Sequence, residues 1–129
     1  MNFARNLSIG IVCVLIGMMS ACNKQEGPTV SYSKDIEPII AANCLECHAN
    51  GGAGEVKSGL SMVTHADLMK GTKFGSIIKP GDSLSSTLVL LIEGKADPSI
   101  KMPHGDRPGL SKAEIKILRQ WIDQGALNN

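Results

Sequence analysis

The stretch Cys44-Leu45-Glu46-Cys47-His48 decides how the rest of this 129-residue chain is organised. Two residues separate its cysteines, which places the sulfurs about one helical turn apart, and an imidazole follows at once. Thiols at this spacing can form thioethers with the two vinyl groups of a haem, while the histidine ligates the iron. The motif therefore predicts one covalent haem c, attached to Cys44 and Cys47, with His48 as the proximal iron ligand.

A Cys-x-x-Cys pair also occurs in redox dithiols and in zinc sites. With 4 cysteines and 3 histidines in the chain, about 0.003 chance occurrences of the full pattern are expected. A redox dithiol needs a thioredoxin-like βαβ setting, and the sequence shows no such pattern. A zinc site needs four ligands, and the remaining candidates are Cys13, Cys22, His65 and His104. Haem attachment is favoured because both of these cysteines have other assignments.

Residues 1–21 are predicted to be a lipoprotein signal peptide. Arg5 supplies the positive charge, and residues 8–19 form an apolar segment of about a dozen residues, shorter than the roughly 20 that span a membrane. The segment ends Met19-Ser20-Ala21-Cys22, and small residues directly before a cysteine resemble a bacterial lipobox. The alternative is ordinary secretory cleavage nearby. Because an unpaired thiol is a liability in an oxidising compartment, we favour lipidation of Cys22.

Removal of the signal leaves 108 residues with 12 basic and 12 acidic side chains. This balance offers no basic excess for a nucleic-acid partner. Residues 22–31 are polar and contain Gly-Pro, so they predict a flexible tether, followed by one domain over residues 32–129. By resemblance to known lipoproteins, Asn23 argues against retention in the inner membrane. We therefore expect a lipid anchor in the outer membrane of a Gram-negative bacterium, with the domain facing the periplasm.

Periodic apolar residues and capping signals predict about four short helices. Ile36, Ile39 and Ile40 form the apolar face of the first, for which Ser33 or Asp35 is the expected cap and Pro38 lies in the first turn. The second expected helix covers residues 64–70. The third runs from a cap at Asp82 or Ser83 to Gly94, with Leu84 on its apolar face. The fourth begins with the capping box Ser111–Glu114 and ends at Gly125, whereas the first covers residues 33–43.

The connecting segments are expected to be irregular. Residues 50–54 are predicted to be a flexible glycine-rich loop, residues 59–62 a short extended piece, and residues 79–82 a turn. No segment alternates apolar and polar residues for long enough to form a sheet, so an all-α fold is expected. Only Tyr32, Phe74 and Trp121 supply aromatic side chains after cleavage, and a buried haem would compensate for so thin a core.

The loop between Gly94 and Leu110 holds the best candidate for a sixth iron ligand. Met102 lies there in a polar setting, beside the stiff Pro103, and has no evident role in a core. A thioether ligand favours ferrous iron and raises the reduction potential, as suits an electron carrier. The alternatives are His104, Met62, Met69, His65 and an open site.

The chain resembles class I-like c-type cytochromes, and among them the planctomycete-type cytochrome c domain. The resemblance covers nearly all of residues 32–129. The matching pieces are residues 32–40, Cys44–His48, Gly59-Leu60, Lys79-Pro-Gly-Asp82, Lys101-Met-Pro103 and residues 110–126, which end Trp-Ile-Asp-Gln-Gly-Ala. It implies a small all-α fold whose first and last helices cross, with His48 proximal and Met102 distal.

The sequence thus predicts a membrane-tethered monohaem electron carrier that is not an enzyme and that docks transiently with redox-protein donors and acceptors. Two alternatives remain. One is a haem-based ligand sensor or peroxidase-like enzyme with a labile sixth site, in which His104 could serve as the distal acid–base group. The other is an electron-relay subunit of a larger oxidoreductase complex.

Overall fold

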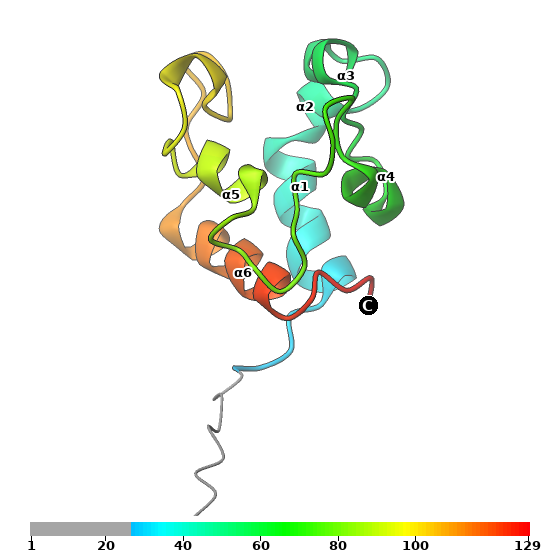
Figure 1. The fold of residues 1–129 in the computed structure, drawn as a ribbon, viewed down its shortest axis with the longest axis vertical. Coiled ribbons are helices and arrows are strands. Elements are labelled where there is room, and N and C mark those ends of the chain that lie inside the picture. Colours follow the sequence, from blue (N-terminus) through cyan, green and yellow to red (C-terminus); the bar gives the residue numbers. More distant parts are fainter. Residues whose placement is uncertain (1–26) are drawn as a thin grey trace, which may run out of the picture.

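Helices account for the regular structure of residues 27–129, which are the residues that the computed structural model describes (Figure 1). Within them the β-type pairing is limited to an isolated bridge between Thr72 and Gly75, so the predicted all-α class is confirmed. The elements are η1 (Tyr32–Ile36), α1 (Glu37–Asn43), α2 (Leu45–His48), α3 (Ala53–Ser58), α4 (His65–Lys70), α5 (Thr87–Ile92), η2 (Pro98–Ile100) and α6 (Lys112–Asp123).

The signal peptide over residues 1–21, the lipidation site Cys22 and residues 23–26 of the predicted tether lie outside the described residues. The rest of that tether is not free of the domain. The side chain of Val30 is 8% exposed and belongs to the core, and Pro28 accepts hydrogen bonds from α6. The packed part of the chain therefore begins before residue 32, the boundary that the sequence suggested. No helix within residues 27–129 has the length and apolar character needed to span a bilayer.

The first helical segment begins earlier than expected and contains a wide turn. Its cap is Ser31, whose hydroxyl accepts from Lys34 N, and neither Ser33 nor Asp35 has this role. The turn of η1 is a π turn, because Glu37 N donates to Tyr32 O. Pro38 then falls in the first turn of α1, where its missing N–H breaks no helical hydrogen bond.

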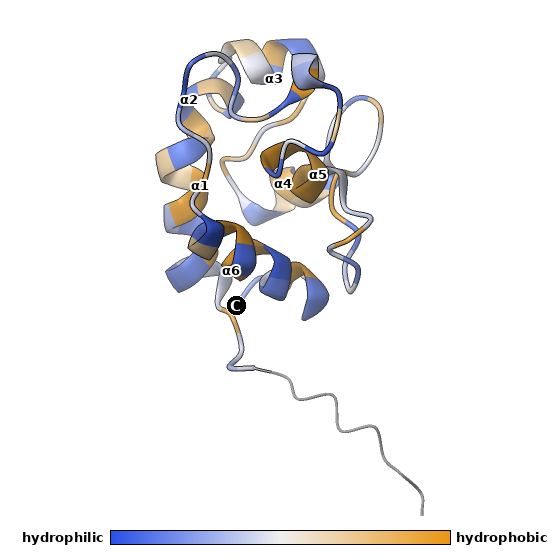
Figure 2. Cartoon of the chain, turned by 90° about the vertical axis from the view of Figure 1, so that its left-hand side faces the viewer, coloured by the Kyte–Doolittle hydropathy of each residue, from blue (hydrophilic) through white to orange (hydrophobic). Residues whose placement is uncertain are grey.

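The last helix, α6, begins as predicted with the capping box of Ser111 and Glu114. Figure 2 shows both hydrophobic and hydrophilic residues along α6, as expected for an amphipathic helix at the surface. Its buried side chains are Leu118, Trp121 and Ile122, and the helix contacts η1 and α5. Trp121 is core: its ring centroid lies 5.6 Å from that of Tyr32, and its Nε1 donates to Leu127 O.

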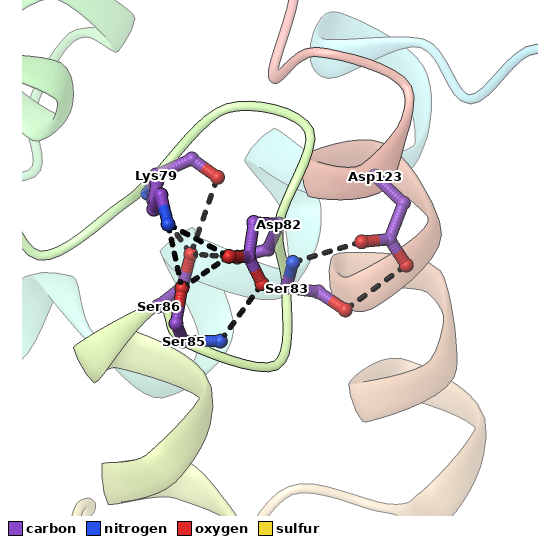
Figure 3. Close-up of polar contacts among 6 residues, drawn as sticks. All are labelled: Lys79, Asp82, Ser83, Ser85, Ser86 and Asp123. Carbon is purple, nitrogen blue, oxygen red and sulfur yellow. Dashed lines mark hydrogen bonds and ion pairs between the residues drawn. The ribbon is translucent and has the colours of Figure 1, made fainter.

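The segment before α5 forms a polar junction with α6 (Figure 3). Ser83 N and Ser83 Oγ donate to the carboxylate of Asp123 at 2.8 and 2.9 Å. Asp82 accepts from Ser85 N, so it caps a turn, and α5 starts only at Thr87. The expected cap at Asp82 or Ser83 is therefore wrong, and Leu84 is 70% exposed instead of lying on the apolar face of a helix.

Two further helices, α3 and η2, were not expected. The haem motif, whose cysteines the sequence placed about one helical turn apart, forms the single turn α2, whereas part of the predicted glycine-rich loop over residues 50–54 forms the start of α3. None of the residues of α3 is buried, so it has no apolar periodicity by which the sequence could indicate it. Local bonds hold it in place: Glu55 accepts from Gly51 N, and Ser58 Oγ donates to Gly54 O.

Candidate haem-attachment site

The two thiols of the haem motif lie on one helical turn at the end of α1. Cys44 follows α1 and precedes α2, and its carbonyl accepts from the backbone N–H groups of Cys47 and His48 at 3.1 and 3.0 Å. Cys44 N in turn donates to Ile40 O, which joins the motif to the core-packed first helix. The backbone therefore fixes the spacing that attachment to two vinyl groups requires.

The imidazole of His48 is oriented by the backbone of a distant segment. Its side chain is buried, with 7% of the residue exposed, and its Nδ1 lies 3.1 Å from Leu60 O. A carbonyl can only accept a hydrogen bond, so Nδ1 is the protonated nitrogen and Nε2 keeps a free lone pair. A second bond, from Met62 N to His48 O, holds the end of the segment over residues 59–62 against the motif. This is the arrangement that an iron-ligating histidine needs. The segment over residues 59–62 is not extended throughout, because Gly59 has a left-handed backbone with φ 75° and ψ 7°.

Gly54 lies close against the Cε1–Nε2 edge of this imidazole. A Cβ at this position would lie 2.7 Å from Cε1 of His48 and 2.8 Å from Nε2. Both separations are shorter than van der Waals contact allows. The residue therefore has to be glycine for the ring to keep its position.

The thiol of Cys44 lies in a protected environment. Burial raises its pKa to about 11, and the neighbouring Cys47 and the carboxylate of Glu114 act in the same direction. The thiol is thus neutral at physiological pH. Residues 27–129 contain no cluster of three or more His, Cys, Asp or Glu side chains of the kind that holds a metal, so they offer no ligand set for the zinc alternative.

Met102 lies on the loop after η2 and is half-buried against the hydrophobic core. Its backbone N donates to Leu91 O at 3.1 Å, which fixes the start of the loop to α5. Further along the same loop, Arg107 pairs with Glu46 inside the haem motif. The structure thus brings the Met102 loop to the segment that carries Cys44, Cys47 and His48, although no hydrogen bond joins Met102 to His48 directly.

The other candidate ligands have different environments. Met62 is a core residue, as expected from its apolar position, and Met69 packs against the same core. His65 opens α4, its Nε2 donates to Ala126 O at 2.8 Å, and its ring lies edge-on to Tyr32. His104 is exposed.

Sequence reasoning missed three parts of this site. The carbonyl of Leu60, the bare Cα of Gly54 and the pair formed by Arg107 and Glu46 became visible only in three dimensions. The glycine-rich composition around Gly54 was the one local signal available, and by itself it indicates a loop equally well.

An all-α domain whose first helix runs into two thiols and an oriented, buried imidazole has the architecture of a c-type cytochrome. Residues 44–106 match a protein family described as Planctomycete cytochrome C. The chain therefore contains a planctomycete-type cytochrome c domain, which indicates a haem-binding electron-transfer protein. No curated protein and no solved structure matches the chain.

Proposed function

We propose that the chain is a monohaem electron carrier, with thioether bonds at Cys44 and Cys47 and axial ligation of the iron by His48 and Met102. One observation carries this proposal: the buried imidazole of His48, directed by Leu60 O, lies on the same turn as both thiols. Such a site holds a haem at three covalent or coordinate points on five consecutive residues.

Met102 is the sixth ligand that the surroundings support best. It is half-buried on a loop, whereas Met62 is buried in the core. The Nε2 of His65 already forms a hydrogen bond with Ala126 O. When bound, the haem supplies a one-electron ferric–ferrous couple, and a thioether ligand favours the ferrous form. The residues of this chain keep both axial groups in place through the bonds to Leu60 O and Leu91 O, which limits rearrangement when the charge changes.

Ligation by Met102 is tested by absorption spectra of the purified protein. The wild type should show the Met–iron charge-transfer band in the ferric state and should bind added carbon monoxide or cyanide slowly. The band should vanish in Met102→Ala and persist in the matched variant His104→Ala. Rapid ligand binding by the wild type would contradict six-coordination and would support a sensor or peroxidase-like enzyme. Absence of a covalent haem band on a denaturing gel would contradict the whole assignment.

The proposal includes a lipid anchor at Cys22 that keeps the domain at the periplasmic face of the outer membrane. It is supported by the small residues directly before Cys22. It also gives each of the four cysteines a role, because Cys13 leaves with the signal peptide and Cys44 and Cys47 bind the haem. The mass of the mature protein should include a diacylglyceryl group, and Cys22→Ser should move the protein from the membrane fraction to the soluble one.

The electron donors and acceptors in this proposal are other redox proteins. They dock at a small patch of the surface, either transiently or as neighbours in a complex.

A further inference from the structure

A groove of about 1100 Å³ runs along α6, between this helix, the end of α5 and the loop that follows it. None of its lining residues belongs to the haem motif, and cationic side chains predominate along it. We call it the basic groove; its charged lining residues are the cations Lys95, Lys101, Lys112, Lys116 and Arg119 and the anions Glu93 and Asp123.

Both anions of the basic groove have partners. Glu93 pairs with Lys95 at 2.7 Å and with Arg119 at 2.9 Å. The carboxylate of Asp123 accepts two hydrogen bonds from Ser83.

Three cations of the groove, in contrast, form no ion pair within residues 27–129: Lys101, Lys112 and Lys116. The groove thus presents three uncompensated ammonium groups, although the mature chain as a whole is neutral. Its partner should therefore be an extended anionic surface.

The amino-terminal end of the described chain is bound at the same groove. Gly27 and Pro28 are among its lining residues. Pro28 O accepts from Nε2 of Gln120 at 3.0 Å and from Nε2 of Gln124 at 3.2 Å. Val30 N donates to Oε1 of Gln124 at 2.8 Å, so side chains at the end of α6 and directly after it fix where the chain enters the domain.

This attachment limits how far the groove can lie from a lipid at Cys22. Five residue steps separate Cys22 from Gly27, and at full extension they span no more than about 18 Å. Figures 1 and 2 show α2 and α3 at the opposite end of the domain from the point where the chain enters it. A lipid at Cys22 therefore keeps the groove near the bilayer and directs the haem motif away from it.

We propose that the basic groove is the membrane-facing surface of the domain and that it binds the anionic headgroups of phospholipids. This proposal rests on the lipid anchor of the proposed function. The charge of the groove and its position beside the tether favour a bilayer over an acidic protein as the occupant. Binding at the groove orients the domain, so that the haem motif faces redox partners on the side away from the membrane.

The test uses the haem-loaded mature chain with Cys22→Ser, so that headgroup binding is measured without the lipid. Co-sedimentation compares vesicles of phosphatidylglycerol mixed with phosphatidylcholine against vesicles of phosphatidylcholine alone. The protein should bind only the anionic vesicles. Replacing Lys101, Lys112 and Lys116 with Gln should weaken this binding on the order of a hundredfold, since each lysine near an anionic surface contributes about fivefold.

A matched variant replaces Lys57, Lys70 and Lys73 with Gln, which makes the same change in charge at residues that do not line the basic groove. It should bind nearly as well as the parent. Equal losses in the two triple variants, or no binding to anionic vesicles by the parent, would overturn the proposal. Unchanged vesicle binding by the groove variant, with slower electron exchange with a small acidic copper protein, would make the groove a protein-docking site instead. Failure of lipidation is detected separately, from the mass of the wild-type protein.

Discussion

Arg107 forms an ion pair with Glu46, the residue directly before the second cysteine of the haem motif. The hydrogen bond and the negative charge of Glu46 hold the pKa of the Arg107 guanidinium above its usual value. The pair fastens the far part of the Met102 loop to α2, while the bond from Met102 N to Leu91 O fastens its beginning to α5. The loop is therefore held at both ends, and its far part lies beside the motif.

Breaking this pair should loosen the loop without unfolding the domain. The side chains of Arg107 and Glu46 are 36% and 72% exposed, so solvent screens the attraction. Arg107→Gln should shift the equilibrium between Met-ligated and displaced forms by no more than about fivefold. The measurement is the pH at which the Met–iron charge-transfer band disappears, which should fall in the variant. Glu46→Gln should produce the same shift, and the double variant should add little to it. Fully additive shifts would show that the pair does not hold the loop, and Lys57→Gln provides a control.

Gly54→Ala should damage the haem site directly. The new Cβ would lie 2.7 Å from Cε1 and 2.8 Å from Nε2 of His48, so either the ring or α3 has to move. We expect a lower ratio of haem absorbance to protein and a loss of about 1–3 kcal/mol in the free energy of unfolding, as for other overpacked sites. Gly109→Ala is the matched control, because a Cβ at residue 109 meets nothing within 4 Å. Equal haem content in the two variants would contradict the role of Gly54.

Asp123→Ala should weaken the junction between α6 and the segment before α5. Ser83 is buried, and the substitution leaves both its N–H and its hydroxyl without their acceptor. A cost of about 1–3 kcal/mol is expected, measured as the shift of the urea midpoint of the haem-loaded protein. Asp106→Ala, which changes the same side chain on an exposed loop, should have little effect. Similar shifts in both variants would show that the Ser83 bonds contribute nothing.

Asp82 should make stability fall in acid. The hydroxyl of Ser85, the ammonium of Lys79 and the N–H of Ser85 hold the pKa of the Asp82 carboxyl well below its usual range. A carboxyl whose folded-state pKa is depressed contributes stability above its unfolded value of about 4, and that stability is lost as the pH falls through the folded value. The melting temperature of Asp82→Asn should therefore fall less between pH 5 and pH 2 than that of the wild type. Parallel curves for the two proteins would contradict this linkage.

Features that depend on near neighbours in the chain were predictable. The capping box of Ser111 and Glu114 and the cap of α4 at Thr64 each use residues three positions apart, so the sequence carries the whole signal. Helix starts failed where another local bond competed. The carboxylate of Asp82 accepts a hydrogen bond from Ser85 N within a turn, so it does not cap the predicted helix. Ser31, and not Ser33, caps the first helical segment, because that segment opens with a π turn before Pro38.

The sequence by itself determined the spacing on which haem attachment is predicted, because two thiols and an imidazole within five residues lie on a single helical turn. Only the tertiary structure decided what these groups face. Leu60 O directs the imidazole from 12 residues away, and Pro28 O accepts hydrogen bonds from Gln120 in α6 and from Gln124 directly after it, 92 and 96 residues away. Such contacts depend on how helices pack, and packing depends on the whole core at once. The pattern of one segment therefore cannot indicate them.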